Sequence, residues 1–124
     1  MELNLERPDY EFALRAADGV SALVNNRRLT RSFVIAPDHL MDTWAVADAA
    51  SLGPAELASL LELQPEVILM GTGEQQVFPS AAIRAACLAR GVGMEVMTNA
   101  AAARTFNVLA SEGRKVVAGF ILPG

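Results

Sequence analysis

Cysteine and histidine are scarce in this sequence, and each shortage excludes a kind of stabilisation or chemistry. Cys87 is the only cysteine and His39 the only histidine among 124 residues. A disulfide within the chain is therefore excluded, which fits a reducing compartment. One thiol and one imidazole are also too few for a structural zinc site. We predict that the protein holds no metal and needs no cofactor.

Basic charge and long apolar runs are also lacking. Ten lysines and arginines stand against fourteen acidic residues, which gives a net charge of −4 and a pI near 4.9. This balance argues against a nucleic-acid binder, because neutralising phosphates requires a basic face. No apolar run reaches the roughly 20 residues of a membrane span. The acidic N-terminus lacks the pattern of a secretory signal or a mitochondrial presequence, so we expect a cytoplasmic protein.

The composition is that of a folded domain. Hydrophobic residues make up 52% of the chain and charged residues 19%, which excludes a disordered or low-complexity sequence. A chain of this length buries roughly two-thirds of its unfolded surface, enough for a core without disulfides. No repeat and no long linker divides the sequence, so we predict one domain over residues 1–124.

The first part of the chain reads as extended structure. Residues 1–18 are polar and predict a loosely held lead-in. Residues 20–24 and 30–35 contain several apolar and β-branched side chains, with the turn-forming pair Asn25–Asn26 between the two segments, and predict a β-hairpin. Residues 42–48 alternate Trp44 and Val46 with small side chains and predict a third, weaker strand.

From residue 54 onward, helix and strand signals alternate. Pro54 begins one helix, Ser80 caps a second, and Thr98 or Asn99 caps a third that runs to Glu112. Strands are predicted at residues 67–70, 92–97 and 116–122. Helical crossovers favour parallel pairing of the strands that they connect. We therefore predict a three-layer α/β fold with a central mixed, mostly parallel sheet flanked by helices and an added N-terminal hairpin.

Two predicted strand ends mark the place where a ligand would bind. Gly71-Thr72-Gly73 follows one strand and Thr98-Asn99 follows the next. Ligands of open α/β sheets bind beyond the carboxyl ends of the strands, and a helix N-terminus there suits an anion. The alternative is a purely structural role, in which Gly71 and Gly73 only allow the chain to turn tightly after the strand. The third glycine of a dinucleotide fingerprint and the lysine of a phosphate loop are both missing.

The last predicted helix carries an arginine and an asparagine on one stripe. Arg104 and Asn107 together would clamp a carboxylate or phosphate in a cleft. Alternatively, Arg104 is solvated or forms an ion pair with Glu95 or Glu112. Glu112 stands at the helix C-terminus, where the dipole disfavours negative charge, so a basic partner such as Arg114 or Lys115 is expected.

No set of side chains predicts catalysis. Cys87 lies on the apolar face of its helix, which predicts a buried and inert thiol. His39 follows Pro37-Asp38 without a nucleophile nearby, and it reads as a surface residue. Trp44 and Phe78 are core or interface anchors in this interpretation. We assign no catalytic residue and do not expect an enzyme.

Several motifs in the second half occur together in a fixed order. They are Glu66-Val-Ile-Leu-Met-Gly-Thr-Gly73, Val77-Phe-Pro79, Gly91-Val-Gly-Met-Glu-Val-Met-Thr98, Ala102-Ala-Arg-Thr-Phe-Asn-Val-Leu109 and Glu112-Gly-Arg114. This order resembles a family of small α/β domains of unknown function. That family includes the third mitochondrial assembly factor of respiratory complex I and an adipogenesis-associated Mth-domain-containing protein. The resemblance covers residues 66–122 well and the hairpin loosely.

The resemblance implies a three-layer α/β fold with a central mixed sheet. Carried over position by position, the marked sites of the family fall on Gly71, Gly73, Pro79, Gly91, Glu95, Thr98, Arg104, Thr105, Asn107, Glu112 and Arg114. No catalytic activity is firmly attached to the family, and its mitochondrial members act through protein partners.

Two functions follow as competing hypotheses. The first is a non-enzymatic protein-interaction or assembly-factor-like module with an unidentified protein partner. The second is a small-anion or metabolite-binding protein or enzyme whose cleft involves Gly71, Gly73, Glu95, Thr98, Arg104 and Asn107. A homodimer is a further expectation, because small α/β domains often hide a sheet edge in this way.

Overall fold

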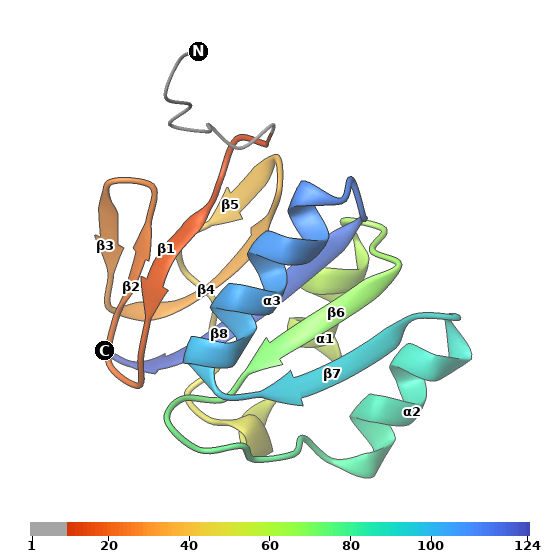
Figure 1. Ribbon diagram of the computed structural model, residues 1–124. Helices are drawn as coiled ribbons and strands as arrows, with labels where there is room; N and C mark the ends of the chain where they lie inside the picture. The colour runs from red at the N-terminus through yellow and green to blue at the C-terminus, as the bar shows by residue number, and fades with distance from the viewer. Residues whose placement is uncertain (1–9) are drawn as a thin grey trace.

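A mixed five-stranded sheet forms the centre of the computed structural model, which describes residues 10–124 (Figure 1). Its strand order is β5-β4-β8-β6-β7. The bounds are β4 Arg31–Ala36, β5 His39–Met41, β6 Val67–Gly71, β7 Gly93–Met97 and β8 Val116–Pro123. Strand β6 pairs in parallel with β7 and β8, whereas β4 is antiparallel to both β5 and β8. The mixed α/β fold predicted from the sequence is confirmed.

A second, smaller sheet precedes the central one. It is antiparallel and contains β1 Leu14–Ala17, β2 Ala22–Val24 and β3 Arg27–Leu29, in that order. The predicted turn at Asn25–Asn26 joins β2 to β3, and Asn25 adopts a φ of +52°. Asparagine tolerates this left-handed conformation better than most residues do.

Helices cover both faces of the central sheet. They are α1 Pro54–Leu61, α2 Ala81–Ala89 and α3 Asn99–Ser111, and a short 3₁₀ turn spans Ala49–Ser51. The predicted caps are present, because Ser80 accepts a hydrogen bond from the Ile83 amide and Thr98 accepts one from the Ala101 amide. These bonds satisfy amides that the first turn of a helix leaves free.

The two sheet faces bury two separate apolar clusters. On one face, α1, α2 and Trp44 pack against side chains such as Ile68 and Met70. On the other face, α3 and the small sheet pack against side chains such as Leu69. Phe33 and Phe120 are register partners within this second cluster, and their rings stack with centroids 5.0 Å apart. Side chains of β6 and β8 point alternately to the two faces and are buried on both, which joins the layers into one unit.

The predicted hairpin is present, but its second strand was assigned to the wrong residues. Residues 20–24 turn back onto Arg27–Leu29 and not onto residues 30–35, which form β4 of the central sheet. The strand signal in 30–35 was sound, but the change of sheet occurs at Thr30. A two-residue turn leaves room only for the immediately following segment to pair.

Two further predictions in the first part of the chain were wrong. Residues 42–48 form no strand, and the short strand β5 lies just before them. Trp44 is nevertheless buried, and its indole Nε1 donates to the Glu56 carbonyl oxygen at 3.2 Å. The predicted lead-in includes strand β1, whose Leu14 is buried, and its residues 1–9 lie outside the described part of the chain.

Candidate functional site

The carboxyl ends of β6 and β7 meet, as the sequence predicts. The Thr72 amide donates to the Met97 carbonyl oxygen at 3.0 Å, and the Asn99 amide donates to the Gly73 carbonyl oxygen at 2.8 Å. Gly71, Gly73 and Thr98 of the predicted site therefore lie together at one edge of the sheet. Gly73 has a φ of +98°, a conformation that other residues rarely adopt.

Asn99 occupies the centre of this edge and is completely buried. Its side-chain oxygen accepts from the Gly73 amide at 3.0 Å, and its side-chain nitrogen donates to the carbonyl oxygens of Asp18 and Ile121, each at 3.0 Å. One amide side chain thus connects four segments of the chain. The sequence placed Asn99 at a strand end and as an alternative helix cap, but did not predict this bridging role.

The polar groups at this edge bond mainly to one another. The Gly73 amide is held by Asn99, and the Ala101 amide by Thr98. The Thr72 hydroxyl accepts from the Val77 amide at 3.0 Å and donates to the Gln75 carbonyl oxygen at 2.6 Å. The Gly73, Val77 and Ala101 amides are therefore already occupied by bonds within the chain. The close approach also excludes a side chain at Gly71, where a Cβ would lie 2.4 Å from Asn99 Oδ1.

A shallow cavity of about 270 Å³ lies beside these groups. Thr72, Gly73 and Val77 line one side, and the end of β8 lines another. Asp48 supplies the only carboxylate of the lining, and it already accepts from the Ser51 amide to cap the 3₁₀ turn. Thr98 and Arg104 are not among the lining residues.

Glu95, Arg104 and Asn107 take separate positions within residues 10–124. Asn107 holds β1 against α3, because its side-chain oxygen accepts from the Leu14 amide at 3.0 Å and its nitrogen donates to the Leu14 carbonyl oxygen at 2.5 Å. Arg104 is exposed on α3, and Glu95 is exposed on β7. Neither takes part in the ion pairs found among the described residues. Ligand binding by the set of six residues stays a prediction.

Several other positions marked by the resemblance have local structural roles. Gly91 follows α2 with a φ of +75°, and the Thr105 hydroxyl donates to the Ala101 carbonyl oxygen. The prediction that Glu112 pairs with Arg114 or Lys115 was wrong, because Glu112 takes part in neither ion pair found among the described residues. Arg114 instead donates to the Glu66 carboxylate at 2.7 Å, which lowers the pKa of Glu66. The Lys115 amide supports the same carboxylate at 3.2 Å.

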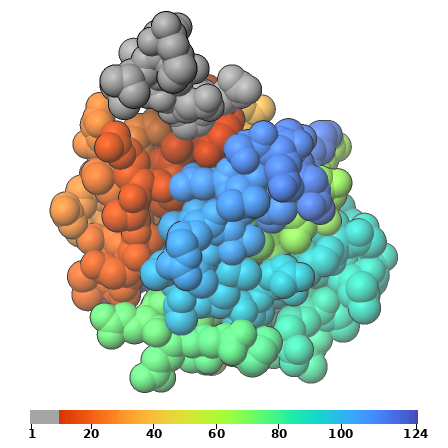
Figure 2. Space-filling view, viewed as in Figure 1, coloured from red at the N-terminus to blue at the C-terminus, as the bar shows by residue number. Residues whose placement is uncertain are grey.

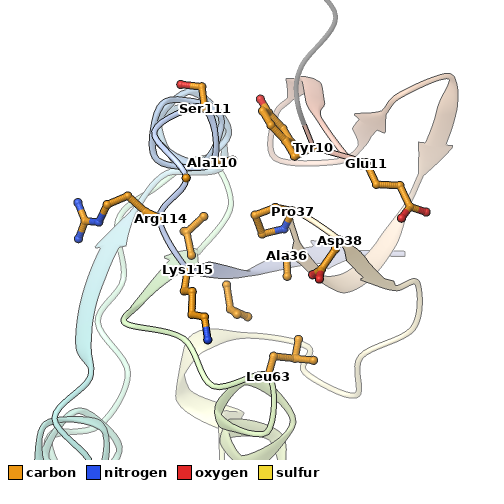
Figure 3. Close-up of a pocket in the computed structure, with 13 residues that line it drawn as sticks. Tyr10, Glu11, Ala36, Pro37, Asp38, Leu63, Ala110, Ser111, Arg114 and Lys115 are labelled. Atoms are coloured by element: carbon orange, nitrogen blue, oxygen red, sulfur yellow. The ribbon is translucent and has the colours of Figure 1, made fainter.

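A second, larger hollow lies at the opposite end of the sheet, and the sequence did not predict it. This cavity of about 540 Å³ lies between the end of α3, the turn after β4 and the end of α1 (Figure 3). Lys115 and Leu63 extend into it, whereas Arg114 and Glu11 point away. Tyr10 stands at its rim, and burial raises the pKa of this phenol. No nucleophile paired with a base lines it, so it offers no catalytic set among residues 10–124.

Cys87 and His39 do not line either of these hollows. Cys87 is buried, as predicted, and loss of solvation raises the pKa of its thiol. His39 is exposed on β5. Over residues 10–124, no group of three or more histidine, cysteine or acidic side chains lies close enough to hold a metal ion.

Fold and sequence together define the class of protein. The fold matches a Bordetella pertussis protein described as a Mth938-like domain, with a TM-score of 0.81 and 30% identity over all of this chain and 94% of that one. A Xanthomonas campestris protein is closer, with a TM-score of 0.85 and 56% identity over all of this chain and 94% of that one. Residues 15–121 match the profile of the family described as "Protein of unknown function (DUF498/DUF598)", and the chain belongs to this family.

One curated relative has a descriptive name. It is the "13 kDa major membrane protein" of Francisella tularensis subsp. holarctica, 34% identical over 71 residues. The match covers 57% of this chain and 58% of the relative's length. Across residues 10–124, the structure contains no helix with the length and apolar character needed to cross a bilayer.

Proposed function

We propose that this chain is a non-enzymatic protein-interaction module, of the assembly-factor kind, that docks a partner protein on the side of α2. Membership in a family without an assigned activity and the absence of a catalytic set over residues 10–124 support an interaction role. The observation that carries the proposal is the outer surface of α2. A cytoplasmic location stays a prediction.

Helix α2 buries very little of itself. Only Ile83 and Cys87 of its nine residues are buried. Leu88 is 74% exposed, and five alanines are exposed beside it. A surface helix normally presents charged and polar side chains to water. Here Arg84 is the only charged residue of the helix, so its outer surface is largely apolar.

The loop before α2 extends the same surface. Val77 is 46% exposed and Phe78 is 55% exposed, and the Arg84 guanidinium lies 5.3 Å from the centre of the Phe78 ring. Figure 2 shows this loop and α2 next to each other along one border of the molecule. We call Val77, Phe78, Arg84 and Leu88, with the exposed alanines, the α2 surface. Exposed apolar patches of this kind mark interaction sites.

A matched pair of substitutions tests the docking surface. Leu88→Asp places a charge on the α2 surface, and Val108→Asp places one on α3, where Val108 is 55% exposed on the other sheet face. Both variants should fold, because exposed substitutions usually change stability by about 0.5 kcal/mol or less. In affinity capture from the native host, Leu88→Asp should lose a partner that Val108→Asp retains.

Three results would contradict the proposal. The first is equal capture by the wild type and Leu88→Asp. The second is a dimer by sedimentation of the pure chain that Leu88→Asp converts to a monomer, because the α2 surface would then serve self-association. The third is loss of the partner from both variants, which would place the docking surface elsewhere.

A further inference from the structure

Strand β7 is an open edge of the central sheet. It comes last in the strand order, next to β6, and α2 packs beside it (Figure 1). Its register with β6 is continuous from Gly93 to Met97, without a bulge. Strand β7 contains no proline, lysine or bulge of the kind that blocks an edge strand, and Glu95 is its only charged residue.

The hydrogen bonding shows which groups point outward. The Met97 carbonyl oxygen accepts from the Thr72 amide, so Met97 faces β6. Backbone groups alternate in direction along a strand, and Met94 and Val96 therefore face away from β6. The Val96 carbonyl oxygen accepts from the Gln76 side chain at 2.8 Å, which agrees with this assignment.

Three backbone groups of this edge remain open among the described residues. They are the amide and carbonyl of Met94 and the amide of Val96. A row of alternating donors and acceptors at strand spacing matches the backbone of another extended chain. A small molecule or a helix would not satisfy it.

Glu95 indicates which side chain the added strand should carry. Its register partner on β6 is the apolar Leu69, and its carboxylate forms no ion pair among the described residues. Arg104 lies on the helix that covers this sheet face, yet it does not pair with Glu95. A lysine or arginine on an added strand, directly opposite Glu95, would form a favourable cross-strand pair.

The same carboxylate disfavours a second copy of this chain. The two-fold register in which the outward-facing residues of both copies pair only with one another sets Met94 against Val96 of the other copy. That register places Glu95 against Glu95 at the centre, where like charges are destabilising. Charge complementarity therefore favours a different protein.

We infer that β7 accepts an extended segment of a partner protein as a sixth strand, with a basic residue of that segment opposite Glu95. This inference rests on the proposed function and names the structural element that the partner supplies. Segment residues beside the basic one point to the opposite sheet face, where α2 lies, so they should be apolar.

The probe is a set of peptides selected from a random twelve-residue library on the immobilised full-length chain. Selected peptides should alternate apolar residues with a lysine or arginine, and they should shift the amide resonances of Met94 and Val96. The Glu95→Lys variant should bind the selected peptides about 5- to 20-fold more weakly. Exchanging the basic residue of the peptide for glutamate should restore binding to that variant.

Two controls test pairing through the backbone. Met94→Pro removes one outward amide and should weaken binding about tenfold, while Met94→Val keeps the amide and should bind like the wild type. Peptides N-methylated at the amides that face β7 should also bind about tenfold more weakly. Methylation at the alternate amides should have no effect, and this comparison leaves the protein unchanged.

The outcomes separate this inference from the proposed function. Peptide binding that is unaffected by N-methylation and is lost in the Leu88→Asp variant would overturn strand addition. It would leave docking on the α2 surface intact. Peptides that bind at β7 while Leu88→Asp still captures the host partner would uphold strand addition and overturn the α2 surface. Recovery of no peptide, or of peptides that shift only distant amides, would overturn strand addition outright.

Discussion

Asn99 and Gly73 are joined by two reciprocal hydrogen bonds. The Gly73 amide donates to the Asn99 side-chain oxygen at 3.0 Å, and the Asn99 amide donates to the Gly73 carbonyl oxygen at 2.8 Å. The loop after β6 is thereby fixed to the first turn of α3. Gly73 and Asn99, which follow β6 and β7, therefore use their hydrogen-bonding groups to hold the fold together.

Asn99→Ala should destabilise the protein strongly. It removes three side-chain hydrogen bonds and leaves the Gly73 amide and two carbonyl oxygens without their partner. Each net bond contributes about 1 kcal/mol, and unsatisfied buried groups add to the loss, so about 3 kcal/mol is expected. Urea denaturation measures it, with the exposed Asn26→Ala as the control. A loss below about 1 kcal/mol would show that the network contributes little.

Gly71→Ala should be destabilising for a steric reason. An added Cβ would lie 2.4 Å from Asn99 Oδ1 and 3.0 Å from a Phe120 ring carbon. Overpacking of this kind costs about 1–3 kcal/mol. Gly93→Ala is the matched control in the neighbouring strand, because nothing lies within 4 Å of its added Cβ. Thermal unfolding should show a lower Tm for Gly71→Ala alone. Equal Tm values for both variants would contradict the packing role of Gly71.

The second half of the fold was predictable because its signals are local. Ser80 and Thr98 cap helices as predicted, and the apolar run at residues 67–70 marks a strand that is buried on both faces. The strand partners of residues 20–35 depend instead on contacts distant in sequence. Leu14 pairs with Val24, and Phe33 with Phe120, and no local pattern encodes the second pairing.

The sequence predicted where the candidate site lies but not which residues form it. Strand order brings Gly71, Gly73 and Thr98 together, which the βαβ pattern of the sequence implies. Asn99 was not recognised as the central residue, because its partners at Asp18 and Ile121 come from distant segments. The exposed edge of β7 depends on the strand order, which periodicity does not determine.

The ion pair of Glu66 with Arg114 predicts a pH dependence of stability. Hydrogen bonds from Arg114 and the Lys115 amide lower the pKa of Glu66 below its ordinary value of 4.5. A carboxyl whose folded pKa lies below its unfolded pKa stabilises the protein fully above the unfolded value. That contribution is lost as the pH falls through the folded value.

Glu66→Gln should therefore flatten the fall in Tm between about pH 5 and pH 3. Part of the acid sensitivity should persist, because amides of Val20 and Ser21 also lower the pKa of Asp18. Glu11→Gln is the control, because the Glu11 side chain is exposed and forms no hydrogen bond among the described residues. An unchanged pH profile in Glu66→Gln would show that the ion pair does not stabilise the fold in solution.

Arg104 and Asn107 share a helical stripe but should respond differently to truncation. Asn107→Ala breaks two hydrogen bonds to the Leu14 backbone and should cost about 2 kcal/mol, because it frees β1 from α3. Arg104→Ala removes an exposed side chain and should change stability by about 0.5 kcal/mol or less. Urea denaturation separates the two effects, and hydrogen exchange should show faster exchange of the Leu14 amide only in Asn107→Ala.

The same Arg104→Ala variant tests anion binding, because Arg104 adds little to stability. If phosphate raised the Tm of the wild type but not of Arg104→Ala, the anion-binding hypothesis would be supported against the hypothesis of a protein-interaction module.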